Sequence, residues 1–484
     1  MSQFQSSTNR ESLLPDSSAA KPSRWLWWLH PKVALSLTLL VFVLLSPFLY
    51  RGYRIAKLPV IDEPFNLTEF GTVTLTPEEN GADLYRSAIA LYRRGQWSID
   101  DFEKALDGGW EQTSEPIRQW VDDNAAALDE WRLATEREQT LFIQPKEMRL
   151  ETQLEHVQKM REFSRLVQLR AAKELHDGNV EEAWKWLRAE YRSSRHSGQH
   201  GVLIGRLVGC AIHNAVTRKM IAWAEDPRVD AEPLRTALAA LDHDWSLTAP
   251  QSASLKAEYL VMKEVIERLG HDRDALKKLG VLDQDAAGSF PFLWGEPEYS
   301  QRAFRLVFEN LLTQIDKPLR DRTKRVGIFK LFEPAPGVVP PITTEKLNAA
   351  AFAHSYVRLL LPALDSCDNA IQREAAQQQT LMLSLASQLY HRQHGDWPTK
   401  LDDLVPDILP KLPADPFGKS GETLLLKRDG DELIIYSVGT NQLDDGGQFG
   451  RSPAGDSFDE GFRLKRPIKS PASTGQETEP QEKK

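Results

Sequence analysis

One uninterrupted apolar run limits how this chain can fold. Residues Val33 to Tyr50 contain no charged side chain and are almost all apolar. A helix of that length spans about 27 Å at 1.5 Å per residue, close to the roughly 30 Å hydrocarbon core of a bilayer. The sequence therefore predicts a transmembrane anchor over residues 33–53, preceded by a disordered cytoplasmic N-terminus over residues 1–32.

A cleaved signal peptide is the competing interpretation of the same run. The polar leader is long, Pro47 and Phe48 occupy the end of the run, and no small-x-small cleavage site follows, so an uncleaved anchor is favoured. Basic side chains lie on both sides of the run, so the positive-inside rule barely decides the orientation. The large folded remainder favours an N-terminus inside and the bulk of the chain outside the cytoplasm.

Composition excludes several classes of protein. The net charge of -9, with no concentrated basic face, argues against nucleic acid as a partner. Cys210 and Cys367 are too few for a disulfide framework, and we expect two buried free thiols, with a single bridge as the alternative. We find no nucleophile elbow, phosphate loop, dinucleotide fingerprint or zinc-protease motif, which favours a protein that is not an enzyme.

The middle of the chain shows helical periodicity. Apolar residues recur three and four positions apart, as they do from Tyr85 to Tyr92, which is typical of helices with one buried face. We expect an all-helical domain over 78–368, after a linker over 54–77. Residues 172–187 resemble a tetratricopeptide hairpin, but no repeat of about 34 residues accompanies them, so the sequence predicts an irregular bundle or a solenoid.

Within this domain, aromatic and histidine pairs invite functional interpretations. Trp184 and Trp186 are expected to be core residues, because aromatics at such spacing are more often buried than displayed. His196 and His200 are four residues apart, as metal-binding histidines on a helix are, but Gly198 lies between them and no third ligand is near. We therefore expect them at the surface or at a helix cap.

The C-terminal part is richer in local signals. A helix should enter from about Asn369 and end at Gly395, because glycine readily adopts the left-handed conformation that ends helices. Thr399 and Asp402 are spaced as in a capping box for a short helix. Residues 423–427 and 433–438 then read as two strands of a hairpin, followed by an acidic, glycine-rich loop.

At these residues the chain resembles a known family. The motifs in order are LYHRQHGDWP, LDDLVPDILPKLPADPFG and IIYSVGTNQLDDGG. They resemble the globular head of the major pseudopilin of type II secretion systems. The resemblance implies a small α+β head over residues 369–464. The polar tail over 465–484 should be disordered, and with the helical domain the fold as a whole should be mainly α. It also implies a protein of the bacterial inner membrane, single-pass, with the bulk of the chain extracytoplasmic.

The resemblance further implies a calcium ion in the acidic loop. Carried over by position, the candidate ligands are Asp444, Asp445, Asp456 and Asp459. Calcium takes six to eight oxygen ligands, and a flexible loop with carboxylates and free carbonyls can supply them. A solvated Gly/Asp loop without an ion is the alternative.

The anchor departs from the pseudopilin family. It lacks the glycine and the glutamate of a prepilin-peptidase site, and a long helical region separates it from the head. Our leading hypothesis is a non-catalytic, single-pass membrane protein. Its anchor would contact the bilayer and its head would contact other envelope proteins. Its role would be envelope protein interaction or secretion-related assembly. The alternatives are a helical binding module for a peptide or envelope ligand, and an envelope hydrolase with a pocket where His196, His200 or His354 meets carboxylates.

Overall fold

The computed structural model describes residues 31–57, 62–271, 296–322, 364–419, 421–450 and 458–466. The chain divides into two compact units, residues 1–58 and 59–484. Helices make up most of the described chain, and a small antiparallel sheet lies near its C-terminal end. The prediction of a mainly α protein with one apolar N-terminal helix is confirmed at this level.

The first unit is built around one helix, α1 (Pro31–Lys57), which contains Pro47. Its stretch Pro31–Tyr50 is the one described segment long and apolar enough to cross a membrane. The side chains along it are exposed within the unit, as those of Leu35 and Phe42 show. A single-pass anchor and a signal sequence both fit this helix, so the uncleaved anchor stays a prediction.

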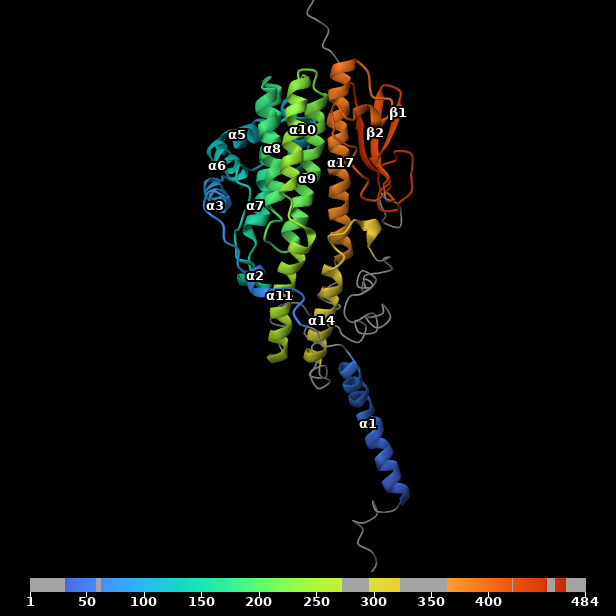
Figure 1. Cartoon of the computed structure of the whole chain (residues 1–484). Coiled ribbons are helices and arrows are strands. Elements are labelled where there is room, and N and C mark those ends of the chain that lie inside the picture. The colour runs from blue at the N-terminus through green and yellow to red at the C-terminus, as the bar shows by residue number, and fades with distance from the viewer. Residues whose placement is uncertain are drawn as a thin grey trace, which may run out of the picture. The chain divides into compact units, whose positions relative to one another are not determined.

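The second unit begins with short helices and continues with long ones (Figure 1). The short helices are α2 (Leu67–Gly71), α3 (Ala82–Leu91), α4 (Ile99–Gly108), α5 (Glu115–Asp123) and α6 (Ala125–Thr135). The long ones are α7 (Glu155–His176), α8 (Val180–His196), α9 (Leu203–Glu225), α10 (Ala231–Ser246), α11 (Gln251–His271), α14 (Glu296–Leu312) and α17 (Leu364–His394).

Helix α8 lies at the centre of the bundle, in contact with α6, α7, α9 and α10. Two glycines let α9 approach it closely. A Cβ added at Gly205 would lie 2.7 Å from the carbonyl oxygen of Ser197, and one at Gly209 would lie 2.5 Å from that of Ser194. Trp184 and Trp186 are buried in the resulting core, as predicted.

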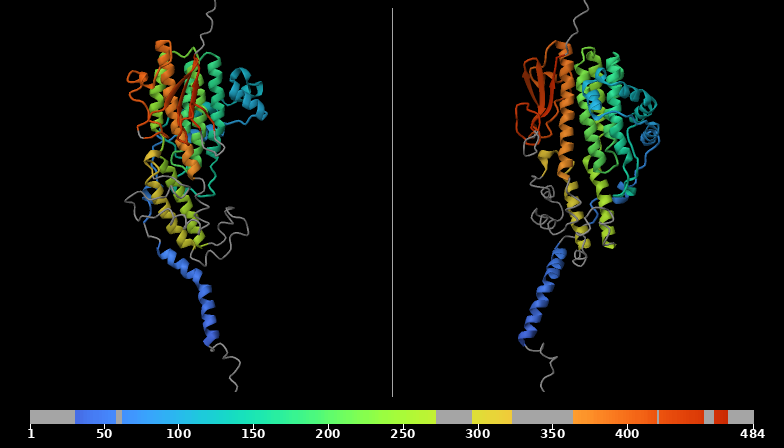
Figure 2. Two further views of the ribbon diagram at one scale, coloured as in Figure 1. Left: turned by 90° about the vertical axis from the view of Figure 1, so that its right-hand side faces the viewer. Right: turned by 180° about the vertical axis from the view of Figure 1, so that it is seen from behind.

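Helix α17 joins the bundle to the C-terminal sheet. It contacts α9 and α10 and also strands β2 and β3, and Figure 2 shows it between the green helices and the red strands. Strands β1 (Leu425–Asp429), β2 (Glu432–Ser437) and β3 (Glu460–Leu464) are antiparallel in that order. The hairpin was predicted to within two residues, whereas β3 was not predicted.

The core of the head is continuous with the core of the bundle. Leu385 of α17 and Ile435 of β2 belong to the same buried cluster as Val216 of α9 and Leu241 of α10. Burial of these side chains stabilises the head and the helical region together, at about 25 cal/mol per Å² of apolar surface. The head is therefore docked on the bundle through α17.

Two local expectations need correction. Residues 62–77, expected within a linker, contain α2. They also contact the bundle, where the Glu63 carboxylate accepts a hydrogen bond from the hydroxyl of Tyr259 in α11 at 2.5 Å. The short helix Leu401–Leu404 is capped by Asp403 and not by Asp402: its carboxylate accepts from the backbone N–H groups of Thr399 and Lys400, at 2.9 and 3.1 Å.

Candidate functional site

The acidic loop after β2 folds back over the outer face of the sheet. Gly447, with φ +81°, lies so close to Ile434 that an added Cβ would be 3.0 Å from its Cγ2. Lys427 of β1 donates to the carbonyl oxygen of Gly446 at 2.8 Å, and the Tyr436 hydroxyl donates to Asp444 Oδ1 at 3.1 Å. The loop is packed against the sheet, which gives its acids defined positions.

Three of the four predicted ligands lie in this packed region. Asp459, which is 1% exposed, accepts from the backbone N–H of Gly447 at 2.7 Å and from that of Asp445 at 3.3 Å. Burial raises the pKa of Asp459, and the negative charges of Asp445 and Asp444 raise it further, against the lowering effect of the two backbone donors. The carboxylates of Asp444 and Asp445 are thus near enough to repel that of Asp459.

This geometry fits a cation only in part. Among the residues that the structure describes, no group of three or more His, Cys, Asp or Glu side chains is arranged to hold a metal ion. The fourth predicted ligand, Asp456, lies outside the described residues. Backbone carbonyls of the loop are also potential calcium ligands. Calcium at Asp444, Asp445 and Asp459 therefore stays a prediction.

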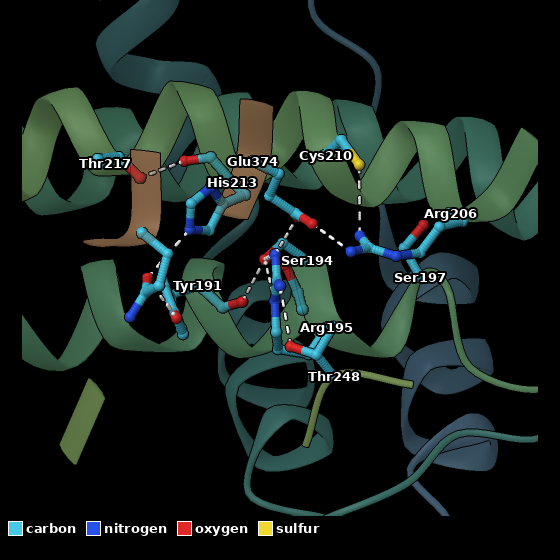
Figure 3. A network of polar contacts seen from close by, with 12 residues as sticks. Tyr191, Ser194, Arg195, Ser197, Arg206, Cys210, His213, Thr217, Thr248 and Glu374 are labelled. Atoms are coloured by element: carbon cyan, nitrogen blue, oxygen red, sulfur yellow. Dashed lines mark hydrogen bonds and ion pairs between the residues drawn. The ribbon is translucent and has the colours of Figure 1, made fainter. Parts of the chain in front are cut away.

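A second polar site lies inside the bundle, where α17 meets α8 and α9 (Figure 3). Glu374 of α17 forms ion pairs with Arg195 of α8 and with Arg206 of α9, and these three side chains are at most 4% exposed. Arg195 also donates to Thr248 Oγ1 at 3.0 Å, and Arg206 donates to Cys210 Sγ at 3.3 Å.

One turn further along α17, a neutral cluster continues this contact. The Oε1 atom of Gln378 accepts from the Tyr191 hydroxyl at 2.7 Å and lies 3.2 Å from His213 Nε2. All three side chains are buried. We call the six residues that connect α17 to α8 and α9 the polar latch: Tyr191, Arg195, Arg206, His213, Glu374 and Gln378.

The electrostatics of the latch keep its groups in fixed protonation states. Burial alone would raise the pKa of Glu374, but the charges of Arg195 and Arg206 outweigh burial and hold that pKa well below its usual value. Burial lowers the pKa of His213 to about 3 and raises the pKa of the Cys210 thiol to about 12. Because a thiol reacts as the thiolate, Cys210 is a poor nucleophile near neutral pH.

The histidines singled out in the sequence lie elsewhere. His196 is 2% exposed and its Nδ1 lies 2.8 Å from the Tyr85 hydroxyl, so the prediction of a surface or cap position is wrong for this residue. His200 is partly buried and its Nε2 lies 2.9 Å from Gln139 Oε1. The cavity between them has about 20 Å³ and includes no carboxylate in its lining.

This cavity at the two histidines therefore lacks the carboxylates that the hydrolase hypothesis requires, and His354 lies outside the described residues. Cys210 and Cys367 are both buried and free, as predicted. Comparisons with known protein families, with curated proteins and with solved structures find no match to this chain.

Proposed function

We propose that this chain is a non-catalytic, single-pass membrane protein whose helical domain holds a pseudopilin-like head for protein interaction at the cell envelope. The observation that supports it is the docking of α17. This helix packs on the sheet with one side and on α9 and α10 with another, and Glu374 pairs there with two arginines. A head fixed in this way is a rigid platform and not a tethered module.

The exposed surface of that platform is the acidic loop. Leu443 is 63% exposed and Phe449 is 38% exposed, although the loop around them is packed on the sheet. Apolar side chains held in exposed positions by an ordered segment are available to pack against a partner. We therefore assign the loop around Leu443 as the surface that contacts an envelope partner.

The partner assignment can be tested by photo-crosslinking in the source cells. A photoreactive amino acid at position 443 should give a discrete crosslinked species in the membrane fraction, whereas the same amino acid at Glu232, an exposed residue at the start of α10, should not. Equal crosslinking from both positions would refute a specific surface at the loop.

We further propose that calcium binds the loop through Asp444, Asp445, Asp456 and Asp459. Burial raises the pKa of Asp459, the charges of Asp445 and Asp444 add to that effect, and a cation there would offset this repulsion. Binding to the folded state alone stabilises it by about 2.7 kcal/mol at a hundredfold excess over Kd. The full-length protein in detergent should therefore melt at a higher temperature with calcium than with chelator.

Two variants make this test specific. Asp459→Asn should abolish the difference between calcium and chelator, because it removes a ligand charge. Asp407→Asn, at an exposed acid elsewhere in the head, should leave that difference unchanged. If wild-type protein melts identically in both buffers, the loop has no calcium role, and the proposed interaction surface must stand on the crosslinking result alone.

A further inference from the structure

A cavity of about 480 Å³ lies on the helical domain, away from the head and the polar latch. It is formed by α4, α5, α7 and the loop between α3 and α4. We call it the aromatic pocket, because four of its lining residues are Tyr92, Trp97, Phe102 and Trp120. Its volume is within the range of small-ligand sites.

The loop that carries Trp97 is held in a fixed conformation. Asn124, which is fully buried, clamps both backbone groups of Arg93: its Oδ1 accepts from the N–H at 2.8 Å and its Nδ2 donates to the carbonyl at 3.0 Å. The indole N–H of Trp120 donates to the same carbonyl at 2.8 Å. Because these buried side chains bind the backbone of Arg93, the start of the loop has a defined position.

Trp97 itself depends on a neighbouring glycine. A Cβ at Gly95 would lie 1.5 Å from Cζ3 of Trp97, so the ring occupies the space that a side chain would fill. There it stacks on Phe102, with ring centroids 5.3 Å apart, and it also contacts Trp120, with ring centroids 4.4 Å apart. The aromatic wall is therefore built before any ligand arrives.

The mouth of the pocket is apolar and exposed. Ile99, the first residue of α4, lines the pocket and is 76% exposed, and the Trp97 ring is only partly covered. Removing the exposed surface of such side chains from water contributes favourable energy to binding. A ligand that covers Ile99 and Trp97 would gain this energy.

The charged groups at the rim are mostly acidic. The side chain of Glu103 lines the pocket and forms no hydrogen bond or ion pair with any other residue that the structure describes. Glu162 already binds Lys159 at 2.8 Å, and Arg165 lies over the Phe102 ring at 5.9 Å. Glu103 is thus the available charge, and it favours a cation beside the aromatic rings.

We propose that the aromatic pocket binds a peptide segment of a partner protein in which a large apolar side chain lies next to a lysine or arginine. The apolar side chain packs between Trp97 and Ile99, and the basic one pairs with Glu103. A sugar is less favoured, because its hydroxyls need several directed hydrogen bonds, and most of the lining is aromatic or aliphatic. This role belongs to the helical domain and is independent of the head.

The test uses an array of synthetic eight-residue peptides and the full-length protein in nanodiscs, followed by titration of labelled peptides. The tightest peptides should pair Leu, Phe or Trp with an adjacent Lys or Arg. Replacing the basic residue by Glu in such a peptide should weaken its binding at least fivefold. Selection of peptides without this pairing, or binding of an oligosaccharide panel in place of peptides, would overturn the proposal.

Three variants place the binding in the pocket. Trp97→Ala should weaken it about thirtyfold, the size of an interface hot spot, and Ile99→Ser, at an exposed position that the fold does not need, should weaken it severalfold. Glu103→Gln should reduce affinity only for peptides with a basic residue, by up to about fivefold. Lys104→Gln, a neighbouring exposed residue that does not line the pocket, is the matched control. Unchanged affinity in both Ile99→Ser and Glu103→Gln would place the binding elsewhere.

Discussion

Glu374→Gln should lower the stability of the second unit more than a carboxylate-to-amide substitution at an exposed ion pair does. One carboxylate serves two buried guanidinium groups, and the amide of Gln occupies nearly the same volume without the charge. Arg195 keeps Thr248 and Arg206 keeps Cys210 as neutral partners, but neither supplies a negative charge. Removing one member of a buried pair costs about 3–5 kcal/mol, and the second arginine places this case at the upper end.

Urea denaturation of full-length protein in detergent, followed by circular dichroism, measures this loss. The matched control is Asp83→Asn, which breaks an exposed pair with Arg86 that contributes at most about 1 kcal/mol. Hydrogen exchange should show where the stability is lost, because the amides of α17 and of the sheet should exchange faster in the Gln variant. If Glu374→Gln unfolds within about 0.5 kcal/mol of wild type, the latch does not hold the head.

The pH dependence carries an independent signature of the same pair. The pKa of Glu374 in the folded protein lies below its usual value of 4.5. Its contribution to stability is therefore fully present above pH 4.5 and decreases as the pH falls from 4.5 through the folded pKa. The Gln variant lacks this part of the acid dependence, so its stability should change less than that of wild type below pH 4.5.

Three further outcomes are expected. Burial lowers the pKa of His196 from 6.5 to about 3, so between these two values mainly the unfolded state takes up the proton. Wild type should therefore lose about 1.6 kcal/mol of stability through this residue between pH 6.5 and pH 5, and the stability of His196→Gln should depend on pH by that much less. Gly209→Ala should cost about 1–3 kcal/mol, because its methyl group would lie 2.5 Å from the carbonyl oxygen of Ser194, and denaturant unfolding should show it. Mass spectrometry should find the mature N-terminus before residue 33; a start beyond Tyr50 would show cleavage.

The elements with strong local signals were predicted well. The apolar run became α1, and the two strand-like segments on either side of the turn at residues 430–431 became the hairpin of β1 and β2. Strand β3 was missed because Gly461 lowers its strand propensity. The structure needs this glycine, since an added Cβ would lie 2.1 Å from the carbonyl oxygen of Ile435.

The polar latch could not be predicted, because its partners are far apart in sequence. Arg195 and Glu374 are separated by 179 positions, and a buried arginine in RSSRH looks the same in the sequence as a solvated one. The same limitation misplaced His196, whose partner Tyr85 is 111 positions away. Periodicity identifies apolar faces, whereas a buried charge is recognised only when its partner from another element is known.

The docking of α17 also determines which surfaces the head can offer. Helix α17 is covered by α9 and α10. The acidic loop covers the outer face of β2 at Ile434 and Tyr436. Strand β1 is an edge, but its exposed residues Lys427, Arg428 and Asp429 are all charged, and charges on an edge disfavour pairing with another strand. In the proposed function the acidic loop is therefore the apolar contact of the head's partner, and for that reason we place the crosslinking probe at Leu443 and not on the edge formed by β1.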